Sequence, residues 1–190
     1  MLFEILRLLL QSFFGLFVLI LMARFWMLFF RVTFRNPVGG MVLALSDWMV
    51  LPVRRVVPAL GGLDLSSVLC AWLVQILLLY LLLLLQEATL GGNLELSVVT
   101  ILALALLELA RSSIYLLIGI VLLQALISWI NPYSTIGPAL APIVRPFYRP
   151  FRRFIPSIRG IDLSPLFLLV SLEIVLVLLG GLHSLILRSS

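Results

Sequence analysis

Residues 65–85 read LSSVLCAWLVQILLLYLLLLL, and Gln75 and Tyr80 are the only long polar side chains in this run. A helix of about 20 mostly apolar residues is needed to cross roughly 30 Å of hydrocarbon, so the run predicts a membrane-spanning helix. The whole chain agrees, since 63% of its 190 residues are hydrophobic and only 11% are charged. Soluble domains have about a quarter of their residues charged, and the composition therefore predicts an integral membrane protein.

Three more stretches are long and apolar enough to span a membrane: Leu8–Phe30, Leu96–Ile130 and Leu166–Leu187. The run near the N-terminus is longer than the apolar part of a cleaved signal peptide, so we expect it to be retained as a helix. Leu96–Ile130 would form a helix of about 50 Å, which is longer than a span requires. Because no proline or glycine lies between Glu108 and Ser113, we expect one long tilted helix rather than two pieces.

The arginines predict the orientation of these spans, because Lys- and Arg-rich loops of bacterial membrane proteins remain in the cytoplasm. The segment Arg31–Asp64 contains four arginines and Asn131–Asp162 contains five, whereas Gln86–Ser97 contains two glutamates and no arginine. We therefore expect both arginine-rich loops to lie inside, in the cytoplasm, and the short acidic connection to lie outside. Both termini are then expected outside, in the periplasm.

The chain also contains an internal repeat. Residues 52–66, PVRRVVPALGGLDLS, align with residues 150–164, PFRRFIPSIRGIDLS, and eight of the fifteen positions are identical. The pattern predicts an all-α membrane protein with four transmembrane helices in two tandem parallel repeats, residues 1–90 and 91–190, each built as helix, arginine-rich loop and helix. The repeated motif positions are Asn36, Pro37, Pro52, Pro58, Asp64 and Ser66 in the first half and Asn131, Pro132, Pro150, Pro156, Asp162 and Ser164 in the second.

This doubled pattern of Asn-Pro, Pro-x-Arg-Arg-x-x-Pro and Gly-x-Asp-x-Ser resembles the YggT family, also called YlmG, over nearly the whole chain. The family tends to have Asp-Pro ahead of the Arg-Arg pair, where this chain has Asp47-Trp48 in one half and Arg145-Pro146 in the other. The resemblance implies a small multi-spanning protein of the bacterial inner membrane or the thylakoid. It links the chain loosely to osmotic tolerance, to division or nucleoid organisation, and to cytochrome assembly in plastids, and no enzymatic activity is established for the family.

Arginines beside aromatic and aliphatic residues form the candidate binding surface. A basic side chain near an anionic leaflet contributes about 1 kcal/mol, and a guanidinium group binds phosphate through two parallel hydrogen bonds. We expect these arginines to bind anionic lipid or an unidentified membrane or cytoplasmic protein, with simple topology determinants as the alternative. Their apolar neighbours argue against nucleic acid. The candidates are Arg54, Arg55, Arg145, Arg149, Arg152 and Arg153.

The motif residues have simpler structural interpretations. Asp64 and Asp162 each precede a spanning helix, where a carboxylate accepts hydrogen bonds from the first helical turn; pairing with the arginines of the same repeat is the compatible alternative. Met41–Leu51 predicts a short interfacial helix. In the second loop a proline recurs every fourth residue, which predicts that no regular helix forms from Ala141 to Pro150.

Polar residues inside the spans are candidate functional groups, because they are costly in hydrocarbon. Gln75 and Glu173 occupy equivalent positions of the two halves, and a hydrogen bond between them is the plainer alternative to a functional role. Glu108 and Arg111 are three residues apart and are expected to neutralise each other. Arg24 is expected to reach the headgroups from the end of its span. No metal or cofactor site is expected.

These features together predict the functional class. The sequence contains no recognisable nucleophile–base arrangement, phosphate-binding loop or dinucleotide motif, so no catalytic residue is assigned and no enzyme is expected. Spans with few polar groups and distinctive loops favour a non-catalytic membrane scaffold or assembly factor. The alternative is a channel or transport-related protein in osmotic or ion homeostasis, which would need a homo-oligomer to line a polar path.

Overall fold

The computed structural model describes residues 1–57, 63–90, 96–130, 136–154 and 163–189. Its described residues form six helices and no strand. Four of the helices are long and apolar enough to cross a membrane, which confirms the all-α class and the four predicted spans. The helices are α1 (Leu2–Phe29), α2 (Pro37–Arg54), α3 (Leu65–Leu90), α4 (Val98–Ile130), α5 (Ile136–Phe154) and α6 (Ser164–Ser189).

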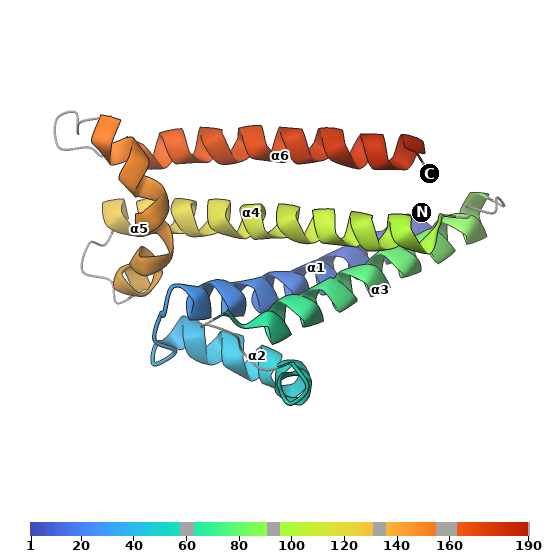
Figure 1. Ribbon diagram of the computed structural model, residues 1–190, viewed down its shortest axis with the longest axis horizontal. Helices are drawn as coiled ribbons and strands as arrows, with labels where there is room; N and C mark the ends of the chain where they lie inside the picture. The colour runs from blue at the N-terminus through green and yellow to red at the C-terminus, as the bar shows by residue number, and fades with distance from the viewer. Residues whose placement is uncertain (58–62, 91–95, 131–135, 155–162, 190) are drawn as a thin grey trace.

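The four long helices run lengthwise and the two short ones lie at one end (Figure 1). α1 packs along α3, α4 packs along α6, and α4 also contacts α1 and α3. We call the end where α1 and α4 finish and α3 and α6 begin the connector end, and the opposite end the terminal end. At the connector end α2 packs on α1 and α3, whereas α5 packs across α4 and α6. α4 is a single helix of 33 residues, which confirms the long-helix expectation.

Two groups of buried apolar side chains hold these helices together. The first joins α1, α2 and α3 around Leu21, Val50 and Ala71. The second joins α4, α5 and α6 around Val121 and Ile143 and extends to the end of α1. Much of the remaining apolar surface is exposed, as is normal where hydrocarbon rather than water is the surrounding solvent.

The segment with the fourfold prolines is helical, so the expectation of an irregular stretch from Ala141 to Pro150 is wrong. α5 runs from Ile136 to Phe154 with Pro142, Pro146 and Pro150 inside it. In a helix each N–H bonds the carbonyl four residues earlier. Prolines spaced by four therefore remove bonds along a single row, and leave the other rows intact.

That row lies on the outer side of α5. Pro146 and Pro150 are exposed, whereas Ile143 and Val144 are buried against α4 and α6. Pro146 and Pro150 are thus accommodated on a part of α5 that the rest of the chain does not cover. The apolar side chains packed on α4 and α6 stabilise α5 and offset the loss of helix stability caused by the prolines. Helix propensity alone does not include this tertiary packing.

The start of α2 follows from its first residues. The Asn36 side chain accepts a hydrogen bond of 2.8 Å from the backbone N–H of Gly39, and its amide donates to the Thr33 carbonyl. Pro37 occupies the first helical turn, where a missing N–H costs nothing. The predicted short helix thus exists and is longer than Met41–Leu51, and its place at the membrane interface stays a prediction.

Candidate functional site

The exposed side of α5 is a row of positive charge, which we call the arginine face: Arg145, Arg149, Arg152 and Arg153. All four are exposed, and their spacing keeps them on one side of the helix. The opposite side buries Leu140, Ile143, Val144 and Tyr148. The guanidinium carbon of Arg152 lies 5.4 Å from the centre of the Tyr148 ring, a cation–π contact that orients this side chain. α5 is therefore strongly amphipathic and presents guanidinium groups outward from the connector end.

The other two candidate arginines lie at the end of α2, Arg54 as its last residue and Arg55 directly after it. Arg54 and Arg55 are exposed at the C-terminal end of this helix. Positive charge is stabilising there because the C-terminal end of the helix dipole is negative. α2 packs on α1 and α3, whereas α5 packs on α4 and α6. The structure therefore divides the six arginines between two helices at the connector end.

α2 turns an apolar side outward. Met41, Leu45, Trp48 and Leu51 follow one another at spacings of three or four residues and are 43–68% exposed. The Trp48 ring stacks on Phe17 of α1 with ring centres 5.6 Å apart. Tryptophan and large aliphatic residues on one side of a short helix are typical of a helix embedded at the bilayer surface.

A buried charged cluster fixes α2 to its neighbours. We call it the Arg24 cluster, and its members are Arg24 of α1, Ser46 and Asp47 of α2, Asp64 directly before α3, and Ser67 of α3. Arg24 Nη1 donates to Ser46 Oγ at 2.7 Å and to Asp47 Oδ1 at 2.6 Å. Arg24 Nε lies 3.6 Å from Asp64 Oδ2. Three helices therefore converge on one guanidinium group.

Asp64 has two roles in this cluster. It is 1% exposed, and its Oδ2 accepts a hydrogen bond of 2.6 Å from Ser67 in the first turn of α3. Nearby, Ser66 Oγ donates to the Val57 carbonyl and so connects the start of α3 to the residues that follow α2. The carboxylate thus interacts with the start of α3 and also pairs with an arginine, although that arginine belongs to α1 and not to the loop.

The Arg24 cluster corrects one expectation and adds a residue. Arg24 is 2% exposed and turns inward to α2 and α3, so its predicted extension to the headgroups is wrong. Buried arginines need paired acceptors, and the two aspartates 23 and about 40 positions later supply them. Their separation along the chain hides this pairing in the sequence, although Asp47 stands where the family pattern has an aspartate.

The two intramembrane candidates do not meet. Gln75 of α3 is buried at 6% exposure, whereas Glu173 lies on the exposed side of α6. No hydrogen bond joins them within the described part of the chain, so the simple pairing is wrong.

Aromatic side chains connect the two halves at the connector end. The Trp26 ring of α1 stacks on Phe30 and meets Phe147 of α5 edge to face, with ring centres 5.5 and 5.9 Å apart. Its Nε1 donates to Ser113 Oγ of α4 at 2.8 Å. This tryptophan therefore holds α1 against both α4 and α5 and fixes where α5 lies.

A second polar group lies toward the terminal end, between α4 and α6. Arg111 and Glu108 of α4 form the expected ion pair at 2.6 Å. Glu108 Oε1 also lies 2.9 Å from His183 Nδ1 of α6. The histidine is thus a link between helices, and no group of three or more possible metal ligands occurs among the described residues.

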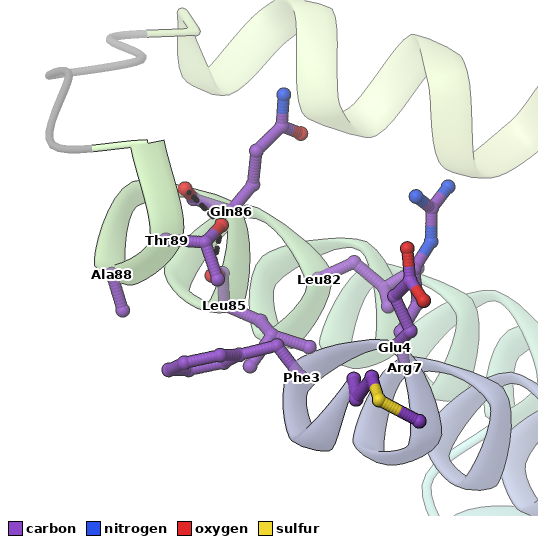
Figure 2. Close-up of a pocket in the computed structure, with 9 residues that line it drawn as sticks. Phe3, Glu4, Arg7, Leu82, Leu85, Gln86, Ala88 and Thr89 are labelled. Atoms are coloured by element: carbon purple, nitrogen blue, oxygen red, sulfur yellow. Dashed lines mark hydrogen bonds between the residues drawn. The ribbon is translucent and has the colours of Figure 1, made fainter.

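A pocket of about 670 Å³ opens at the terminal end, between the start of α1 and the end of α3. Figure 2 shows Phe3, Glu4 and Arg7 of α1 facing Leu85 and other residues of α3. Charged groups line it, but none of the motif residues does. Five motif positions, Pro58, Asn131, Pro132, Pro156 and Asp162, lie outside the described residues.

Four apolar helices with arginine-bearing connecting helices define a multi-pass α-helical membrane protein. A family model described as CCB3/YggT matches the chain twice, over residues 3–85 and over residues 96–183. The chain therefore belongs to the CCB3/YggT family, as its motifs suggested.

Individual relatives agree with this assignment. A protein of Vibrio alginolyticus named "Uncharacterized protein in proC 3'region" is 30% identical over 92% of both chains. "Uncharacterized protein PA0392" of Pseudomonas aeruginosa is 32% identical over 87% of this chain and 83% of its own. "Uncharacterized protein YggT" of Escherichia coli K12 is 30% identical over 88% of this chain and 85% of its own. No solved structure matches the chain.

Proposed function

We propose that this protein is a non-catalytic scaffold or assembly factor of the bacterial inner membrane. It presents the arginine face and the end of α2 on the cytoplasmic side to anionic lipid or to an acidic protein partner. The single observation that carries the proposal is the outward row of four arginines on a helix whose other side is packed on α4 and α6. The excess of arginine in both connections supports the cytoplasmic orientation.

The geometry of α5 supports a binding role for its arginines, in addition to any role in setting the orientation of the chain in the membrane. An arginine that only determined orientation would need no fixed backbone, yet these four extend from a helix held by buried apolar contacts and by Phe147. Such fixed guanidinium groups lose less conformational freedom when they bind phosphate or carboxylate. The neighbouring aromatic rings suit the headgroup region of the bilayer.

The test changes the arginine face and measures what the protein retains. Arg145→Ala with Arg149→Ala is expected to lower the anionic phospholipid that co-purifies in detergent, or to abolish recovery of a cross-linked partner, with membrane insertion intact. Arg7→Ala with Arg188→Ala removes the same charge from the terminal end and serves as the matched control. Equal retention of lipid and partner in both double variants contradicts the proposal.

Ion flux separates this function from the channel alternative. In liposomes the scaffold predicts no flux above that of empty vesicles. Within one chain Glu173 lies on the exposed side of α6, which favours the scaffold over a pore in a monomer. Flux that is abolished by Glu173→Gln and unaffected by the arginine variants would support a channel instead.

A further inference from the structure

One side of α6 is left uncovered by the rest of the chain. α6 packs on its neighbours through Leu168 and Leu176, which are 4% and 7% exposed. A different side of the helix carries a row of residues that we call the α6 seam. Its members are Leu166, Val170, Glu173, Val177, Gly180 and Ser184. Its members alternate spacings of four and three residues, the pattern by which one helix contacts another along its length. Its three aliphatic residues are 54–73% exposed.

The carboxyl group of Glu173 lies at the middle of this seam. It is nine positions after Ser164, about 14 Å along the helix, so it lies close to mid-depth in a hydrocarbon layer of roughly 30 Å. A shallow groove of about 420 Å³ surrounds it, and every other lining residue is apolar. No described residue forms a hydrogen bond or an ion pair with it. A carboxyl group in hydrocarbon without a partner is costly.

Small residues occur where the seam approaches the terminal end. A Cβ atom placed on Gly180 or Gly181 would meet nothing within 4 Å, so the packing of this chain does not require either glycine. Glycine lowers helix stability relative to alanine. Gly180 and Ser184 are four residues apart, the small-x-x-x-small spacing that lets two helix backbones approach closely in a membrane.

We propose that the α6 seam is the contact between two copies of this chain. Copies inserted in the same orientation are related by a twofold axis along the membrane normal. Two α6 helices then run parallel, and Glu173 meets Glu173 of the second copy at the same depth. A protonated carboxyl group has one donor and one acceptor, so the pair forms two reciprocal hydrogen bonds and leaves no polar group facing lipid.

Self-complementarity favours a second copy over another partner. The occupant has to present, at mid-membrane depth, a group that donates and accepts opposite Glu173, with small residues nearer the terminal end. The seam itself meets all of these requirements when it is rotated onto a copy of itself. Lipid tails provide neither a donor nor an acceptor.

Cross-linking in native membranes tests the contact directly. In a Cys70→Ala background, Val177→Cys is expected to form a disulfide-linked dimer on oxidation. Val175→Cys is the matched control, because Val175 lies within about 3 Å of the same depth and is 41% exposed, but is about 160° away around the helix and does not line the groove around Glu173. We expect at least fivefold less dimer from the control. Equal dimer from both variants, or a Val177→Cys product with a different protein, overturns the proposal.

Dilution in liposomes tests the role of the carboxyl group. Energy transfer between labelled copies is followed as lipid is added. Glu173→Leu is expected to weaken self-association about tenfold, while Glu173→Gln, which keeps a donor and an acceptor, stays within about twofold. Gly180→Leu is expected to separate the helices as well. Unchanged association in both Glu173→Leu and Gly180→Leu contradicts the proposal, and the readout does not involve the arginine face.

Discussion

Arg24 is a buried charge whose acceptors come from two other parts of the chain. Its side chain is 3% exposed, and the side chains of its ion-pair partners Asp47 and Asp64 are 41% and 1% exposed. Removing one member of a buried pair leaves the other charge uncompensated, which is more damaging than losing both. The stability of the first three helices therefore depends on the complete cluster.

We expect Arg24→Leu to lower the free energy of unfolding by about 3 kcal/mol, because Asp64 remains buried without a counter-charge. Adding Asp64→Leu to this variant is expected to recover part of the loss. The measurement is reversible unfolding in mixed detergent micelles. Arg35→Leu, at an exposed position, is the control and is expected to change stability by less than about 0.5 kcal/mol. A loss of the same size in both single variants would contradict the role of burial.

Two adjacent glycines at the start of α2 are expected to respond in opposite ways. A Cβ on Gly39 would lie 2.7 Å from the Cα of Phe34, whereas one on Gly40 would meet nothing within 4 Å. Gly39→Ala should therefore destabilise the protein by about 1–3 kcal/mol through the clash. Gly40→Ala should stabilise it by up to about 1 kcal/mol through helix propensity. Melting temperatures of the two variants in one detergent provide the measurement, and equal shifts would show that the Asn36 turn is looser than described.

At the scale of elements, α4 and α6 are joined toward the terminal end by Glu108 and His183. Their contact of 2.9 Å connects two helices and adds to the apolar packing nearer the connector end. Polar contacts between membrane helices average about 0.6 kcal/mol in double-mutant cycles. The link therefore contributes little to the total stability of the protein, and its main effect is to align α4 with α6.

A double-mutant cycle should detect this link. We expect Glu108→Ala and His183→Ala to show a coupling energy of about 0.6 kcal/mol, and not above about 1.7 kcal/mol. Glu108→Ala with Ser184→Ala is the matched cycle and should show no coupling, since the Ser184 hydroxyl donates to the Gly181 carbonyl within its own helix. Coupling of equal size in both cycles would exclude a specific contact.

The sequence predicted the four spanning helices correctly, but it wrongly predicted an irregular backbone where α5 is helical. Apolar runs of about 20 residues identify spans because every backbone group has to be bonded within the helix. Proline propensity misled because it describes an isolated helix, whereas α5 is stabilised by the packing of Ile143 and Val144 and leaves Pro146 and Pro150 exposed. The sequence places prolines in a row but does not say which side of the helix will be buried.

For the whole molecule, the orientation in the membrane stays a prediction. Cysteines placed at Arg149 and at Ala88 provide the measurement, because both positions are exposed and lie near opposite ends of the bundle. A membrane-impermeant thiol reagent applied to intact spheroplasts should label Ala88→Cys, and should label Arg149→Cys only after the membrane is opened. The reverse pattern would place the arginine face outside and exclude the proposed cytoplasmic partner.

The candidate site was only partly predictable at this scale. The arginines of α5 were found because charge within an apolar chain is conspicuous in sequence. The Arg24 cluster was not found, because its members come from three helices and only the packing of α2 on α1 and α3 brings them together. The predicted pairing of Gln75 with Glu173 failed for the same reason. Two residues at equal depth can point in different directions, because depth does not determine how each helix is rotated about its axis.

The Arg24 cluster also imposes an order on biosynthesis. Arg24 leaves the ribosome 23 residues before Asp47 and about 40 residues before Asp64. At about 5–20 residues per second, roughly two to eight seconds pass before both eventual acceptors of this guanidinium group have been synthesised. During that interval water, lipid phosphate or the insertion machinery has to solvate the charge. The first three helices therefore become a self-sufficient unit only when translation has passed Leu90, the end of α3.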